Sequence, residues 1–212
     1  MPVLAGLLAP IVFSLGVVVA GLTWPGYRHR TQNVSDLGGT EAPFAIVQNA
    51  NFVLTGLLVV AFASRLVRSD IGRRTAASPW LVGFFGATMA IQGATPCTPG
   101  CAQGTVADVV HGLAALSGFG SMVVATLLVW RAMRSEAGWA TFARFSAWTG
   151  IVTLAFVVAW LATTAIDPGM LAAGVHQRLF IATVLVWLGS TALRLLPSSQ
   201  ETSVADGDRV CG

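Results

Sequence analysis

The chain has 212 residues, of which 55% are hydrophobic and only 10% charged, and its mean hydropathy is +0.74. Soluble domains carry about 25% charged residues, so this composition excludes an ordinary water-soluble domain and indicates an integral membrane protein in contact with membrane lipids. The net charge of +3 comes from arginine alone, and the arginines flank apolar segments, which argues against a nucleic-acid partner.

Six apolar segments follow one another along the chain, and each is long enough to predict a helix that crosses a membrane. We expect these helices at about residues 3–24, 44–66, 80–94, 106–133, 142–165 and 175–196. The first segment lacks the basic start of a signal peptide, so it is expected to be retained. The predicted fold is an all-α, polytopic bundle over residues 1–196. The polar segment 197–212 is predicted to be a disordered cytoplasmic tail.

The arginines predict the orientation of this bundle, because cytoplasmic loops carry the excess of positive residues. With six crossings, one side holds seven or eight arginines, namely Arg65, Arg68, Arg73, Arg74, Arg131, Arg134, Arg144 and Arg194. The other side holds three: Arg28, Arg30 and Arg178. Both termini are therefore predicted to be cytoplasmic, with the first, third and fifth loops outside.

Polar side chains gather where the second, fourth and sixth predicted helices begin, in the outer part of the membrane. Intramembrane polar residues are costly and prompt a functional hypothesis, and three outward helix N-termini favour an anionic group. We therefore predict an outward-facing polar pocket for a lipid or a small anionic ligand, formed by Asp36, Gln48, Asn51, Asp108, His111, His176 and Arg178. The alternative is structural, because an acid in a first helical turn and amides between helices need no ligand.

His111 is the candidate catalytic residue, because a histidine titrates near neutral pH and Asp108 lies three residues before it on the same helical face. The pair predicts an acid–base enzyme acting on a lipid or isoprenoid substrate. We expect no cofactor. A weaker alternative is a zinc site formed by Asp108, His111 and His176, although the sequence contains no HExxH motif.

Cys97 and Cys101 stand in the sequence TPCTPGCAQG, in the predicted outward third loop. Because that side of the membrane is oxidising, we expect a short disulfide that staples the loop. A redox pair and metal ligation by two thiolates are the alternatives, although redox motifs of the thioredoxin type have CxxC spacing.

The stretch YRHRTQNVSDLGGTEAPFAIVQNANFVLTGLL resembles the opening of a bacterial and archaeal membrane family called domain of unknown function 998. The resemblance rests on Ser35, Asp36, Leu37, Gly38, Pro43, Asn49 or Asn51, Phe52 and Gly56, and more loosely on Asp108, His111 and Gly112 and on His176, Gln177 and Arg178. It covers roughly residues 8–196 and implies six helices in the plasma membrane of a prokaryote. It implies no activity, and the cysteine pair is not expected of the family.

Three functions remain open from the sequence. The first is a binding or transport protein that holds a lipid or a small anionic ligand. The second is an intramembrane enzyme, acid–base or metal-dependent, that uses His111 and Asp108. The third is a structural subunit of a membrane complex. The sequence does not predict the oligomeric state.

Overall fold

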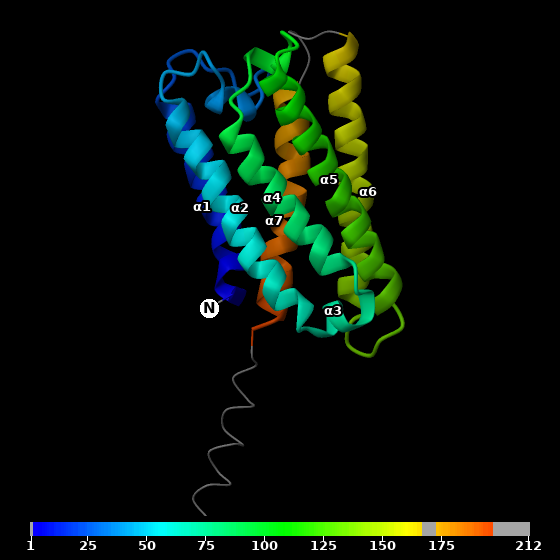
Figure 1. The fold of residues 1–212 in the computed structure, drawn as a ribbon. Helices are drawn as coiled ribbons and strands as arrows, with labels where there is room; N and C mark the ends of the chain where they lie inside the picture. Colours follow the sequence, from blue (N-terminus) through cyan, green and yellow to red (C-terminus); the bar gives the residue numbers. More distant parts are fainter. Residues whose placement is uncertain (1, 167–172, 197–212) are drawn as a thin grey trace, which may run out of the picture.

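The computed structural model describes residues 2–166 and 173–196, and this part of the chain is helical with no strand, which confirms the all-α class. The predicted tail lies outside the described residues. Six long helices lie over the six apolar segments (Figure 1): α1 (Pro2–Leu22), α2 (Ala45–Val67), α4 (Ser78–Ala94), α5 (Val106–Met133), α6 (Ala140–Ile166) and α7 (Ala173–Arg194). Three short elements complete the description: α3 (Asp70–Thr75) and the 3-10 turns η1 (Ser35–Gly38) and η2 (Pro99–Cys101).

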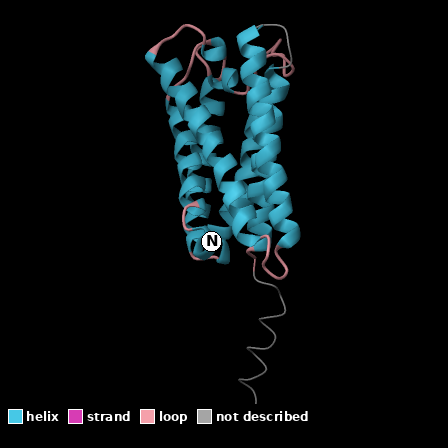
Figure 2. Ribbon diagram, turned by 90° about the vertical axis from the view of Figure 1, so that its right-hand side faces the viewer, coloured by secondary structure: helices cyan, strands magenta, loops and turns pink. Residues whose placement is uncertain are grey.

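The long helices form a closed ring, because each packs against the next along the chain and α7 returns to pack against α1. Figures 1 and 2 show them running roughly along one direction, with the start of α1 and the end of α7 at the same end of the bundle. We call this the terminal end. The opposite end is covered by residues 23–44 and 95–105, which include η1 and η2, and we call it the capped end.

Local sequence signals set where two of the helices begin. Thr105 and Asp108 form a capping box at the start of α5, in which each side chain accepts a hydrogen bond from the other residue's backbone N–H. Ser69 caps α3 by accepting from the N–H of Gly72. Such caps satisfy N–H groups that the helix itself leaves unpaired.

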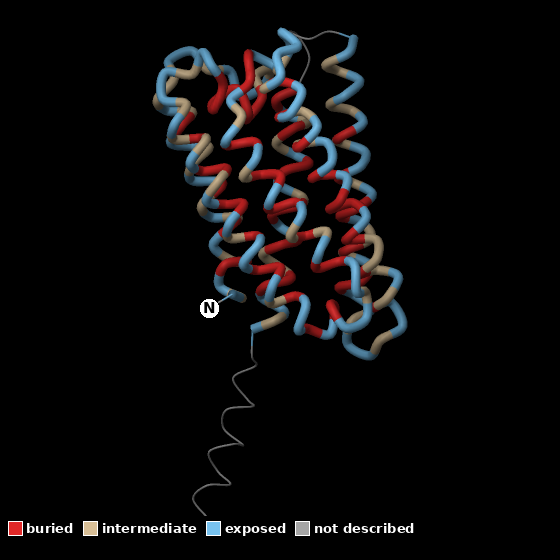
Figure 3. The backbone as a smooth tube through the Cα atoms, in the orientation of Figure 1, coloured by how far each residue is buried: buried red, intermediate tan, exposed pale blue. Residues whose placement is uncertain are grey.

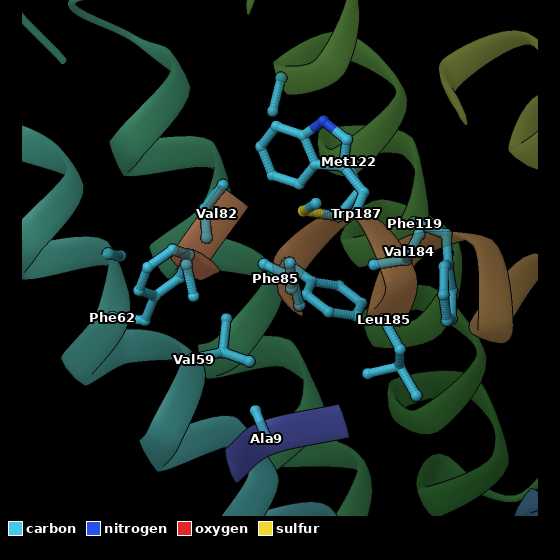
Figure 4. Close-up of a cluster of buried hydrophobic side chains, with 14 of the residues drawn as sticks. Ala9, Val59, Phe62, Val82, Phe85, Phe119, Met122, Val184, Leu185 and Trp187 are labelled. Carbon is cyan, nitrogen blue, oxygen red and sulfur yellow. The ribbon is translucent and has the colours of Figure 1, made fainter. Parts of the chain in front are cut away.

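Buried residues alternate with exposed ones along each long helix (Figure 3), and a cluster of buried hydrophobic side chains fills the interior of the ring (Figure 4). Phe62, Phe85 and Trp187 are among the largest fully buried side chains. The indole Nε1 of Trp187 donates to the hydroxyl of Ser146, 2.9 Å away, so this buried donor is satisfied between α7 and α6. Buried polar groups require such partners, because an unmade hydrogen bond costs about 1–3 kcal/mol.

The outer surface of the bundle is also apolar, as expected of a protein solvated by lipid. Large hydrophobic side chains such as Leu15, Leu57 and Leu113 are half or more exposed on different helices. By length and composition, four of the described helices are able to cross a membrane: α1, α2, α5 and α6. The structure thus supports a membrane protein. The predicted count of six crossings goes beyond these four helices, because α4, with 17 residues, and α7 are not among them.

Candidate functional site

Asp36 fastens the first loop to the third at the capped end. Its carboxylate is buried and accepts hydrogen bonds from the N–H groups of Asn33 and Gly100, at 2.8 and 2.9 Å. Burial raises the pKa of Asp36, and these two hydrogen bonds act in the opposite direction. Asp36 was predicted as a ligand-binding residue, but in the structure its oxygens bind the chain itself.

Arg178 ties the start of α7 to the first loop in a similar way. Its guanidinium donates to the carbonyl oxygens of His29, Gln32 and Gly174, at 2.7–3.0 Å, and to the hydroxyl of Tyr27 at 2.7 Å. These contacts engage both terminal nitrogens of the guanidinium, which was predicted to help bind an anionic ligand. The arrangement therefore favours an anchoring role for Arg178.

Asp108 is likewise engaged by its own surroundings. Besides the capping box, one carboxylate oxygen accepts from the N–H and the hydroxyl of Thr98, at 2.8 and 3.0 Å. Thr98 lies between the two cysteines of the third loop, so Asp108 fixes that loop over the start of α5. The structure supports the stabilising interpretation of this acid.

His111 is buried and points into the bundle from α5, with an exposed fraction of 4%. Its Nδ1 lies 3.0 Å from the carbonyl oxygen of Thr95, just beyond the end of α4. A carbonyl oxygen only accepts, so in the neutral ring Nδ1 carries the hydrogen and Nε2 keeps the lone pair. The rings of Phe52 and His111 pack edge to face, with their centroids 6.2 Å apart. His111 is thus held in one orientation with one basic nitrogen.

Gln48 and Asn51 lie on one face of α2, as predicted, and they join α2 to α1. The amide of Asn51 donates to the carbonyl oxygen of Phe13 at 3.0 Å and to the side chain of Gln48 at 3.3 Å. The Nε2 of Gln48 is buried and has no hydrogen-bond partner among the described residues. Asn51 therefore links α2 to α1, and Gln48 supports it from within α2.

His176 does not meet His111. Its ring lies against Phe156 of α6, with centroids 6.4 Å apart, and its buried Nδ1 has no partner among the described residues. Within the described part of the chain, the possible metal-ligand atoms that come within 4.8 Å of one another belong to Cys97, Cys101 and His111. The predicted combination of Asp108, His111 and His176 is not brought together in this way.

The predicted disulfide between Cys97 and Cys101 is present, with their Cα atoms 5.1 Å apart. Cys97 is buried and Cys101 is half-buried. Cys101 has φ +52° and follows Gly100 at φ +63°, so the chain turns sharply between the two cysteines. The disulfide closes this turn directly above His111.

A cavity of about 70 Å³ lies inside the ring, beneath the capped end. All six long helices contribute to its mainly apolar wall, which includes Phe85, Ala115, Phe119 and Phe180. Polar side chains gather toward the capped end: Asn33, Gln92, His111 and Gln177, together with the half-buried Cys101. Of the predicted site residues outside the disulfide, only His111 lines this cavity.

Three of these polar residues were not among the predicted site residues, namely Asn33, Gln92 and Gln177, although Gln177 stands in the His176, Gln177 and Arg178 part of the family resemblance. Their arrangement follows from contacts between distant segments. The side-chain oxygen of Gln177 accepts from the backbone N–H of Val34, and that of Asn33 accepts from Nε1 of Trp160 at 3.0 Å. The one available signal was that Gln92 and Gln177 are polar residues near the ends of apolar segments.

Two further hollows adjoin the cavity. A groove of about 510 Å³ runs between α1 and α7, and it shares Phe13, Val34, Ile181 and Leu185 with the cavity wall. At the capped end, a second hollow of about 440 Å³ is lined by Asp36, Pro99 and their neighbours, and it shares Asn33 and Gly100 with the cavity. The cavity therefore lies between an apolar groove and a more polar hollow among the loops.

Comparison with known proteins gives one match. The model of a family described as "Protein of unknown function (DUF998)" matches residues 7–194, which is most of the chain. No curated protein and no solved structure matches the chain.

Proposed function

The chain belongs to the DUF998 family of proteins of unknown function, and we propose that it binds a lipid with an apolar chain and an uncharged polar head. The observation that carries this proposal is the cavity inside the ring, which has apolar walls and polar side chains toward the capped end. An apolar site with a few convergent polar groups is the usual form of a ligand pocket, and the cavity of about 70 Å³ reaches the size of such a pocket together with the adjoining groove of about 510 Å³.

The proposal includes a six-span topology with the capped end outside the cell, in the plasma membrane. Two independent features favour this orientation. The connections at the terminal end contain most of the arginines, such as Arg73 and Arg134, as the positive-inside effect requires. The disulfide lies at the capped end, and disulfides persist on the oxidising side.

An uncharged head fits the cavity better than an anionic one. No arginine lines the cavity, and the donors of Arg178 already bind loop oxygens. A buried anion without a cationic partner is strongly disfavoured in a low-dielectric interior. Amide and imidazole groups, in contrast, suit hydroxyl and carbonyl oxygens of a neutral head group.

The groove between α1 and α7 offers space for the apolar chain. From Arg178 to Leu193 it follows about 15 residues of α7, which at a rise of ~1.5 Å per residue is about 22 Å. The side chains of Phe13, Val34, Ile181 and Leu185 belong to the walls of both the groove and the cavity. A lipid lying in the groove thus reaches the cavity when these side chains change rotamer.

The test is photolabelling of the full chain in lipid nanodiscs with a farnesol that carries a diazirine. Phe85 lines the cavity and is only 1% exposed, so its labelling reports a molecule inside the ring rather than surrounding lipid. We expect Phe85 to be labelled in the unaltered chain. Labelling confined to exposed residues such as Leu113 would overturn the proposal.

A matched pair of substitutions sharpens this experiment. Ala115→Leu adds three carbon atoms at the cavity wall, one helical turn from His111. Ala155→Leu makes the same change at an exposed position of α6 outside the cavity. We expect labelling of Phe85 to fall at least tenfold in the first variant and to be unchanged in the second. Equal labelling in the two variants would contradict a site in the cavity.

A further inference from the structure

The disulfide lies at the capped end, next to the cavity inside the ring and to the hollow of about 440 Å³ among the loops, which we call the outer hollow. Cys101 lines the cavity together with Gly100, and Gly100 also lines the outer hollow. Cys101 is half-buried, whereas Cys97 is 1% exposed. Cys101 is therefore the less buried of the two cysteines, and it lies against the space inside the ring.

His111 completes a cluster that is chemically suited to thiol oxidation. A ring nitrogen of His111 and the two Sγ atoms lie within 4.8 Å of one another. Because Nδ1 is committed to the carbonyl of Thr95, Nε2 is the nitrogen that is free to take a proton. A thiol reacts as its thiolate, so a neighbouring base promotes both exchange and oxidation.

We propose that Cys97 and Cys101 form a redox-active pair that passes electrons to an isoprenoid quinone bound in the cavity. This inference rests on the proposed function and names its ligand class. A quinone is uncharged, carries an apolar prenyl tail and presents two carbonyl oxygens as acceptors. These properties match the apolar wall and the amide N–H groups of Gln92 and Gln177, which donate to carbonyl oxygens, while Nε2 of His111 stands beside them as a proton acceptor.

The chemistry balances in two steps. An external dithiol attacks at the more accessible Cys101; its two sulfurs become a disulfide, and Cys97 and Cys101 become thiols. In the second step the two thiols lose two electrons and two protons and form their disulfide again. The quinone takes up those two electrons and two protons and becomes a quinol. His111 accepts one thiol proton at Nε2 and passes it to a quinone oxygen.

The second step is tested with the full chain in nanodiscs, in a Cys211→Ser background so that free thiols report Cys97 and Cys101 alone. The disulfide is reduced with a phosphine, the phosphine is removed, and decylubiquinone is added without oxygen. We expect two thiols to disappear for each quinol formed. Thiols that persist while quinol does not form would overturn the inference.

Two variants separate this chemistry from folding. Ala115→Leu should abolish oxidation by decylubiquinone, yet leave oxidation by water-soluble diamide unchanged, because the loop side of the disulfide is not altered. His111→Gln keeps a donor for the Thr95 carbonyl but offers no basic nitrogen, so oxidation should slow on the order of 100-fold. An unchanged rate and pH profile in His111→Gln would refute the role of the imidazole.

The photolabelling experiment distinguishes failure of this inference from failure of the proposed function. A diazirine-bearing quinone that labels Phe85 without oxidising the thiols would leave a lipid-binding protein and remove the redox role. A quinone probe that labels exposed residues alone would remove the redox role, and both proposals would fall if the farnesol probe also labelled exposed residues alone. Retention of one Zn²⁺ per reduced chain, lost in His111→Gln and accompanied by no quinol, would replace the redox role with a metal site.

Discussion

Tyr27 offers a direct test of how the first loop packs against α7, because it is the single tyrosine in the sequence. Its hydroxyl donates to the carbonyl oxygen of Asn33 at 2.6 Å and accepts from Arg178. Burial raises the pKa of Tyr27 from 10.0 to about 12, and the charge of Arg178 acts in the opposite direction. Absorbance at 295 nm, which reports tyrosinate, therefore follows this one side chain.

The sign of the effect on stability follows from these values. Between pH 10 and 12 the unfolded chain releases the phenol proton while the folded chain keeps it, so stability falls as pH rises through this interval. The difference of about 2 pH units corresponds to at most ~3 kcal/mol. Solvent screening of a half-buried ring reduces it to ~1–2 kcal/mol.

The assay is a spectrophotometric titration of the chain in detergent, with helical structure followed by circular dichroism. We expect a midpoint near pH 12 for the folded chain and near pH 10 after unfolding, and no 295 nm transition in Tyr27→Phe. Arg178→Gln should move the folded midpoint higher still, because it removes the favourable charge. A midpoint of 10 in the folded chain would show that the loop does not bury Tyr27 against α7.

Two further predictions concern stability. Gly86→Ala should lower the free energy of unfolding by ~1–3 kcal/mol more than Gly83→Ala on the same helix. A Cβ at Gly86 would lie 2.7 Å from the carbonyl oxygen of Gly56, whereas at Gly83 the nearest atom is 3.5 Å away. Equal unfolding midpoints of the two variants in detergent would contradict the close crossing of α2 and α4. Burial raises the pKa of Asp36, so stability should fall as pH rises from 3.8 to that raised value. Asp36→Asn should abolish this slope and, at pH 7, cost ~1–3 kcal/mol through one unpaired N–H; unfolding curves between pH 3 and 7 check both effects, and a slope that persists would refute the assignment.

The sequence indicated that polar side chains would gather at one end of the helices. The structure shows why the sequence did not determine what each of these side chains binds. Asp36, Asp108 and Arg178 were expected to bind a ligand because charged groups near a membrane are costly. In the structure each is hydrogen-bonded to backbone groups of loops from elsewhere in the chain, and ligand binding by them stays a prediction. The position of a loop carbonyl or N–H has no signature in the composition of the helix that meets it.

The sequence by itself determined the helical class, the positions of the six long helices and the cysteine staple, because these follow from local properties. The position and length of an apolar segment predict where a long helix begins and ends. A spacing of four residues in a turn brings two cysteines close enough for a disulfide. Only the tertiary structure decided that His111 lies beside that disulfide while His176 faces α6. The rotation of each helix about its axis decides which side chains share the interior, and the packing of all six helices sets that rotation.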